Sequence, residues 1–287
     1  MALARASRFG HHDRLGSLHH LDDAARARAA ASVHEGRSVS LGRPLAPAAS
    51  RRHDGKASFS LELFQSASAN GQFVVGSDHV ELDCHGHTNT HIDALNHLGF
   101  GGSFYSGWAL DDPEAPSVTD LVAHGIVTRA VLADVTKVRG TPWVDAAAPV
   151  QGADIERALG DAGVTLEPGD ALLLYMGRDR FEAAGHTYTP YTDAPMPGVG
   201  SDAARWVGEQ RISLLAWDFL DATHPDEPGP TIHWLLWAIG LVLVDNADFS
   251  RAVPALAASH RASAAITVSP LDIRGATGCN VNPTLLL

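Results

Sequence analysis

The sequence predicts a single α/β domain of mixed α+β character, and three observations support this class. Five short apolar runs rich in Val, Ile and Leu are typical of buried strands. Segments with helical periodicity lie between these runs, and strands that alternate with helices indicate an α/β or mixed α+β domain. No Pro-, Ser- or Gly-rich linker divides the 287 residues and no internal repeat is visible, so we expect one domain.

The predicted elements follow one another along the second half of the chain. The first predicted helix, 154–163, has an apolar face and ends at Gly163. The second helix, 201–210, opens with a capping Ser or Asp, and the third, 230–240, opens with Pro and closes with Gly. The predicted strands cover residues 130–135, 171–177, 212–218, 240–246 and 264–273.

The charge of the chain is negative and unevenly distributed. A formal net charge of −12 argues against nucleic acid or an anionic membrane as the main partner. Residues 1–52 nevertheless carry nine Lys and Arg against four Asp and Glu. This basic segment is either an arm that docks on its own body or on a neighbouring subunit, or a solvated helix. Two cysteines, no signal-like apolar run and no stretch of about 18–20 apolar residues predict a cytoplasmic protein.

Familiar phosphate-binding and nucleophile motifs are absent from the sequence. The glycine-rich segment 99–107 lacks the Lys-Ser/Thr ending of a phosphate loop, and no Gly-x-Ser-x-Gly occurs. Turn-rich stretches at 99–117 and 185–200 are long for plain connectors, and such loops often border binding sites.

The segment "ELDCHGHTNTHIDALNHLGF" (81–100) concentrates histidines and carboxylates. Four-residue spacing separates His87 from His91 by about 13 Å in a straight strand, too far to share an ion. The chain must therefore bend around residues 88–90 or become helical near Thr90, which would place Asp93 and His97 on one helix face. We interpret His87, His91, Asp93 and His97 as a metal site, and assign His79 and His85 to the core or to positions beside the ligands.

The histidine-rich segment resembles the signature of a known family. "HTNTHIDALNH" (87–97) is similar to the His-x-Gly-Thr-His-x-Asp-x-x-x-His signature of the cyclase family, which includes bacterial kynurenine formamidase, isatin hydrolase and trans-dienelactone hydrolase. Segments 9–45, 125–135, 167–178 and 276–283 extend the resemblance over most of the chain. Asn89 replaces the signature Gly, and Leu95 replaces a Pro of the formamidases. The latter favours the larger, isatin-hydrolase-like branch.

The resemblance implies a fold and further ligands. It predicts an N-terminal arm (1–52) and a cyclase-like domain with a swivelling β/β/α fold (53–287). It also predicts two late ligands at His233 and Asp245, where Asp stands in place of the usual Glu. These two residues would bind a second ion, together with Asp93 and His97, or would orient His97.

The predicted activity is metal-dependent hydrolysis of a small cyclic or activated amide or lactone. A Zn²⁺ or Mn²⁺ ion on His87, His91 and Asp93 would activate water, and His97 would act as general base with His233 and Asp245 in the catalytic site. Alternatives are a metal-dependent cyclase or lyase that uses the same site, or an inactive metal-binding member. The resemblance suggests a homodimer or homotetramer. The candidate substrate-binding residues are Phe59, Phe100, Tyr105 and Trp217.

Overall fold

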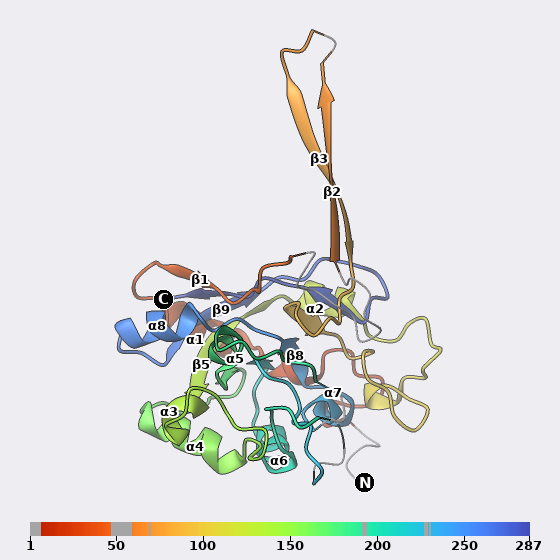
Figure 1. Cartoon of the computed structure of the whole chain (residues 1–287). Helices are drawn as coiled ribbons and strands as arrows, with labels where there is room; N and C mark the ends of the chain where they lie inside the picture. Colours follow the sequence, from red (N-terminus) through yellow and green to blue (C-terminus); the bar gives the residue numbers. More distant parts are fainter. Residues whose placement is uncertain (1–6, 47–58, 69, 191–193, 227–228, 230) are drawn as a thin grey trace.

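A nine-stranded mixed sheet runs through the molecule (Figure 1). The computed structural model describes residues 7–46, 59–68, 70–190, 194–226, 229 and 231–287. Its elements, in chain order, are η1 (Gly16–His20), α1 (Asp23–Ala31), β1 (Ser38–Ser40), β2 (Phe59–Ala67), β3 (Val74–Leu82), β4 (His91–Asp93), η2 (Tyr105–Gly107), α2 (Val118–His124), β5 (Ile126–Asp134), α3 (Val135–Arg139), α4 (Gly152–Asp161), β6 (Ala171–Tyr175), α5 (Arg178–Ala183), α6 (Ser201–Glu209), β7 (Leu214–Trp217), α7 (His233–Ile239), β8 (Val242–Asp245), α8 (Ala252–Ala258), β9 (Ser263–Val268), β10 (Gly278–Asn280) and β11 (Thr284–Leu286).

The centre of the sheet is parallel and its flanks are antiparallel. The strand order is β1-β11-β9-β5-β6-β7-β8-β4-β10, and β5 to β8 pair in parallel. The five apolar runs form β5 to β9, so the predicted mixed α/β class is confirmed. The last predicted strand, 264–273, ends early at Val268, because Pro270 lacks the N–H that a sheet ladder needs.

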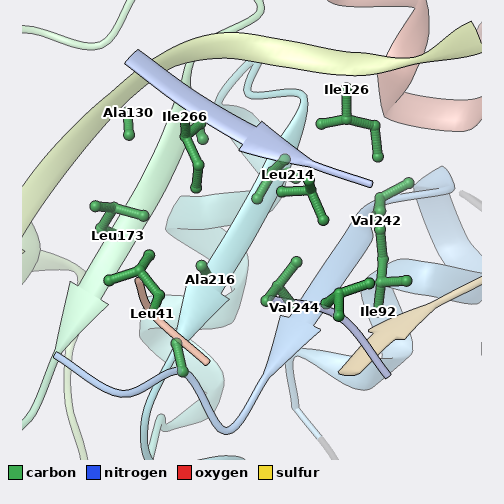
Figure 2. Packing of buried hydrophobic residues seen from close by; sticks show 14 of the residues in the cluster. Leu41, Ile92, Ile126, Ala130, Leu173, Leu214, Ala216, Val242, Val244 and Ile266 are labelled. Atoms are coloured by element: carbon green, nitrogen blue, oxygen red, sulfur yellow. The ribbon is translucent and has the colours of Figure 1, made fainter. Parts of the chain in front are cut away.

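Alternate residues of the central strands face two separate cores. Ala130, Leu173, Leu214 and Val244 point into one core, where helices α1, α2 and α8 pack (Figure 2). The residues between them point into a second core that is covered by α3, α4, α6 and α7. Because both faces of the sheet are covered, the sequences of these strands are continuously apolar rather than alternately apolar and polar.

The described part of the N-terminal arm packs on its own body. β1 pairs with β11, and the Arg14 guanidinium forms an ion pair with Asp120. Gly16, at a φ of +52°, approaches the Gly240 backbone so closely that a Cβ would collide with it. The predicted boundary at residues 52 and 53 lies outside the described residues.

Two further features complete the fold. Strands β2 and β3 form a separate two-stranded ribbon that projects from the body (Figure 1). Among the described residues, no helix combines the length and apolar character needed to cross a membrane.

Candidate metal centre

The site forms where strands of the sheet bring distant residues side by side. β4 pairs antiparallel with β8, and His91 is the direct partner of Asp245. Side chains alternate along a strand, so His91 and Asp93 project to the same side. The helix predicted near Thr90 is wrong, because His91–Asp93 is held as a strand between β8 and β10. The alternative prediction, a bend around 88–90, is confirmed by bends at residues 87–89.

Asp93 lies at the centre of four imidazole rings. Its side chain is fully buried. The Nδ1 atom of His85 is 3.0 Å from Asp93 Oδ1, and His91 Nε2 is 3.5 Å from the same oxygen. On the other side, Asp93 Oδ2 is 3.7 Å from His233 Nε2 and 3.9 Å from His97 Nε2. Each carboxylate oxygen therefore faces two ring nitrogens.

Among the described residues, neither oxygen of Asp93 has a hydrogen-bond partner in good geometry, although His85 Nδ1 lies within reach of Oδ1. Burial raises the pKa of this carboxyl, but the nearby His97, His85 and His91 lower it further, so that its pKa lies below the usual range. An ionised carboxylate without hydrogen bonds in a protein interior is strongly unfavourable unless a cation compensates it. The buried oxygens of Asp93 are therefore the structural signature of a cation site.

Two rings are oriented so that their inner nitrogen can bind a cation. His91 Nδ1 lies 2.8 Å from the carbonyl oxygen of Asn89, which leaves Nε2 directed at Asp93. His85 Nε2 lies 2.9 Å from Thr277 Oγ1, which leaves Nδ1 on the Asp93 side. In metal sites the outer ring nitrogen is held in this way by a carbonyl, carboxylate or similar group, and the inner nitrogen is the ligand.

His233 is held by carboxylates on both sides of its ring. Its Nδ1 is 2.5 Å from Asp221 Oδ2, and its Nε2 is 3.1 Å from Asp245 Oδ2. Burial lowers the pKa of His233, but Asp221 and Asp245 raise it well above its usual value. Asp221 also accepts the backbone N–H of Ile232, and Trp217 Nε1 donates to Asp245 Oδ1 at 2.5 Å. Both carboxylates beside His233 are therefore fixed in place.

A cavity of about 260 Å³ opens onto this cluster. Burial lowers the pKa of His97, with Asp93 opposing that shift, so the His97 imidazole is neutral near pH 7. The ring of His97 stacks on His85 at a centroid distance of 3.9 Å. The cavity is lined by His85, Gly86, His87, His91, His97, Leu98, Leu220, His233 and Asp245.

The structure brings together most of the residues that the sequence singled out. His91, Asp93, His97, His233 and Asp245 all lie in the cluster. His87 lines the cavity but belongs to neither of the two potential ligand groups among the described residues. One group is His85, His91 and Asp93, and the other is Asp93, His97 and His233. Both groups fit a divalent cation, because they combine imidazole nitrogens with a carboxylate.

The four predicted substrate-binding aromatics do not line this cavity. Trp217 is fully buried behind Asp245, and Tyr105 is buried and donates its hydroxyl to Asp13 of the arm. Phe59 begins the β2 ribbon. Phe100 is half-exposed and packs on Trp234 and Trp237.

Sequence reasoning missed several residues of the site. His85 was assigned beside the ligands or to the core, yet it is as close to Asp93 as any ring. The sequence patterns predicted no role for Asp221. An Asp just after the predicted strand 212–218 nevertheless indicates a candidate site residue, because the carboxyl ends of parallel strands open into binding crevices. Burial raises the pKa of the Cys84 thiol, beside His85, above the usual range of a thiol.

The comparisons with known proteins agree with this fold. The family described as "Putative cyclase" matches residues 38–224. This chain belongs to the cyclase family. It has no significant sequence match among curated proteins.

Solved structures share the fold at low sequence identity. A structure described as a novel cyclase superposes with a TM-score of 0.85 and 22% identity, covering 99% of each chain. Isatin hydrolase A from Labrenzia aggregata, bound to benzyl benzoate, has a TM-score of 0.66 and 20% identity over 92% of this chain and 98% of its own. A metal-dependent hydrolase from Bacillus stearothermophilus, described as predicted, has a TM-score of 0.52 and 18% identity over 87% and 97%.

Proposed function

We propose that this chain is a metal-dependent hydrolase of a small cyclic or activated amide or lactone. The observation that carries the proposal is the buried Asp93 carboxylate, which faces four imidazole nitrogens and has no hydrogen bond in good geometry among the described residues. The burial of such a carboxylate is energetically unfavourable without a cation and becomes favourable when a cation binds. Isatin hydrolases are among the structures that share this fold, and isatin is a cyclic amide.

The proposed primary ligands are His85, His91 and Asp93, with His87 at the edge of the same cavity. A mixed nitrogen and oxygen donor set suits Zn²⁺ or Mn²⁺. A divalent cation bound there would supply a Lewis acid that polarises an acyl carbonyl and makes water more acidic.

His97 is the proposed general base. Its Nε2 faces the Asp93 carboxylate from the cavity side, and its lowered pKa keeps the ring neutral and able to accept a proton. His97 would take the proton of the attacking water and deliver it to the leaving nitrogen or oxygen of the substrate. The side chains of Leu98 and Leu220 line the cavity and would limit access of bulk water to the acyl group.

The size and lining of the cavity support the proposed substrate class. A volume of about 260 Å³ suits a small molecule rather than a polymer. The described residues of the lining combine imidazoles with Leu98, Leu220 and Asp245 and include no Lys or Arg, so an uncharged substrate fits better than an anion. Aromatic lactams, N-formyl arylamines and small lactones meet these conditions.

The test combines acid release with substitution of His97. Wild-type protein loaded with Zn²⁺ or Mn²⁺ should release one titratable acid per turnover from a lactam, formamide or lactone in a pH-stat. His97→Asn should keep its metal and lose about 10²–10⁴-fold in turnover, the usual contribution of a positioned proton acceptor. His34→Asn, at an exposed histidine, is the matched control and should keep both.

Three outcomes would contradict this account. Turnover without acid release would favour the cyclase or lyase that uses the same residues. Loss of metal together with turnover in His97→Asn would make His97 a ligand. Full turnover in His97→Asn would exclude it from the chemistry.

A further inference from the structure

A second cavity lies at the carboxyl end of strand β5, away from the metal centre. Its volume is about 380 Å³, and its lining comes from the end of β5, from α3, α4 and α8, and from the turn that leads into β9. Among the described residues, none lines both this cavity and the one at the metal centre. β8 is three strands away from β5, which is about 14 Å across the sheet. The two cavities are therefore separate sites.

The register of the sheet explains why this cavity, here called the β5 cavity, is open. β9 begins at Ser263, which pairs with Val131, so residues 132–134 of β5 extend past the start of β9. Helix α8 packs on one face of the sheet and α4 on the other, with β5 between them (Figure 1). The space beside the end of β5 thus lies between helices of opposite faces. Crevices of this kind at the carboxyl ends of parallel strands commonly bind ligands.

Backbone hydrogen bonds hold the outer wall of the β5 cavity. The N–H of Leu132 donates to the carbonyl of Ala262 at 2.8 Å, which ties the turn after α8 to β5. In that turn the N–H of Arg261 donates to the carbonyl of Leu256 at 3.1 Å, and His260 has a left-handed φ of +52°. A left-handed residue with such a bond closes the carboxyl end of a helix. The backbone that carries Arg261 is therefore fixed at the rim of the cavity.

Charged side chains of both signs line the β5 cavity without pairing with one another. Asp134 and Asp161 contribute carboxylates, and Lys137 and Arg261 contribute cations. Within the described part of the chain, the side chains of Asp161, Lys137 and Arg261 make no hydrogen bond or ion pair. Asp134 Oδ1 accepts from the Lys137 N–H at 3.0 Å and from Thr136 Oγ1 at 2.6 Å, which leaves Oδ2 for a ligand. Charges of both signs that face one cavity without contact fit a ligand that carries both charges.

The same cavity also has an apolar surface. Leu132 and Leu256 are buried, and Val253 is partly buried beside them. A volume of about 380 Å³ suits a small molecule. The matching ligand is therefore small, carries a positive and a negative group, and has an apolar part.

We propose that the β5 cavity binds a free α-amino acid with an apolar side chain. Arg261 and Lys137 pair with the carboxylate of the amino acid, and Asp134 and Asp161 pair with its ammonium group. The side chain of the amino acid lies on the apolar surface of the cavity. A ligand with a single charge would leave the protein charges of one sign without a partner, whereas a zwitterion forms charge-assisted hydrogen bonds with both.

Isothermal titration calorimetry of the full-length protein compares three probes that share one side chain. L-leucine carries both charges, N-acetyl-L-leucine lacks the ammonium group, and L-leucinamide lacks the carboxylate. We expect one leucine to bind per chain. N-acetyl-L-leucine and L-leucinamide should each bind more weakly by about 10-fold or more, because each loses one set of charge-assisted hydrogen bonds.

Two variants assign each charge of the ligand to its partners. Arg261→Gln should weaken the binding of leucine and N-acetyl-leucine by about 10-fold and leave that of leucinamide unchanged. Asp134→Asn keeps a side chain that can cap α3, and it should weaken leucine and leucinamide but not N-acetyl-leucine. Arg274→Gln and Asp111→Asn, at exposed residues outside the cavity, are the matched controls and should bind all three probes like wild type.

A third variant fills the β5 cavity. Ala257→Phe, at an exposed lining residue of α8, places a ring in the cavity and should abolish leucine binding in a protein whose circular dichroism is unchanged. A wild type that does not bind leucine would overturn the proposal, and so would N-acetyl-leucine or leucinamide that binds as tightly as leucine. Wild-type leucine affinity in the three cavity variants would place the amino acid elsewhere, for example on the metal centre, and would overturn the proposal as well.

Discussion

At the scale of single residues, the site depends on which ring nitrogen each histidine turns toward Asp93. The Asn89 carbonyl and the Thr277 hydroxyl hold the outer nitrogens of His91 and His85. Asp221 does the same for His233 with a carboxylate. These partners decide whether a lone pair or a proton points at the cation position, and none of them is itself part of a ligand group.

Substitution of Asp221 tests this orientation directly. Asp221→Asn keeps the shape of the side chain but weakens the acceptor at His233 Nδ1, so His233 loses its charged orienting partner. We expect divalent-metal affinity to fall about 10–100-fold, the usual effect of removing such a partner. Competition with a chromophoric chelator measures this, and Asp226→Asn at an exposed carboxylate is the control. Equal affinities for Asp221→Asn and wild type would remove His233 from the metal site.

At the scale of elements, the loop between β3 and β4 is positioned by residues far along the chain. Asn246 donates through Nδ2 to the carbonyl oxygens of Gly86 and Asn89 and accepts from Arg178 Nη1. Arg178, fully buried, also donates to the His87 carbonyl at 2.7 Å. The path of the loop, and therefore which of its histidines reaches Asp93, is decided by these contacts.

These contacts explain why the sequence predicts the cluster but does not decide between His85 and His87 as a ligand. Spacing alone shows that His91 and Asp93 project together and that the chain must bend before them. It does not distinguish His85 from His87, because the bend depends on Asn246 and Arg178, which lie well outside the motif.

Asn246 therefore offers a test of the loop. Its φ of +56° is left-handed, so Asn246→Gly removes the side chain without backbone strain, whereas Asn246→Ala adds strain. Loss of the side chain removes the Nδ2 hydrogen bonds to the Gly86 and Asn89 carbonyls and the Oδ1 acceptor of the buried Arg178 Nη1, and we expect the free energy of unfolding to fall by about 2–4 kcal/mol in either variant. Urea unfolding measures this, with Asn246→Ala the less stable of the two. A change below about 0.5 kcal/mol in Asn246→Gly would show that the loop holds its shape independently.

At the scale of the whole molecule, the central sheet was predictable and its margins were not. β5 to β8 contain the continuous apolar runs seen in the sequence, because both faces of the parallel sheet are covered. By contrast, four marginal strands have three residues each, which are too few to show any periodicity: β1, β4, β10 and β11. These strands form only because neighbouring strands pair with them. The β2–β3 ribbon does alternate, but Leu63 and Val74 are exposed in the part of the chain that the structure describes.

The arm shows the same dependence on the assembled body. Charge asymmetry predicted that residues 1–52 either dock or are solvated, without choosing between these. In the structure, Leu18 and Leu21 are buried in the core that α2 and α8 also cover, and Ser17 donates to the Ser213 carbonyl. The described arm is thus an integral layer of the fold, held by apolar contacts that its charge pattern did not reveal.

The central claim is that the buried carboxylate of Asp93 holds a divalent cation. The most direct measurement is elemental analysis of wild type and Asp93→Asn after identical loading with Zn²⁺ or Mn²⁺ and removal of free metal. Asn fits the same space but carries no charge, so wild type should retain at least one ion per chain and Asp93→Asn should retain none, with turnover lost in parallel. Full metal content and full turnover in a folded Asp93→Asn protein would contradict the account.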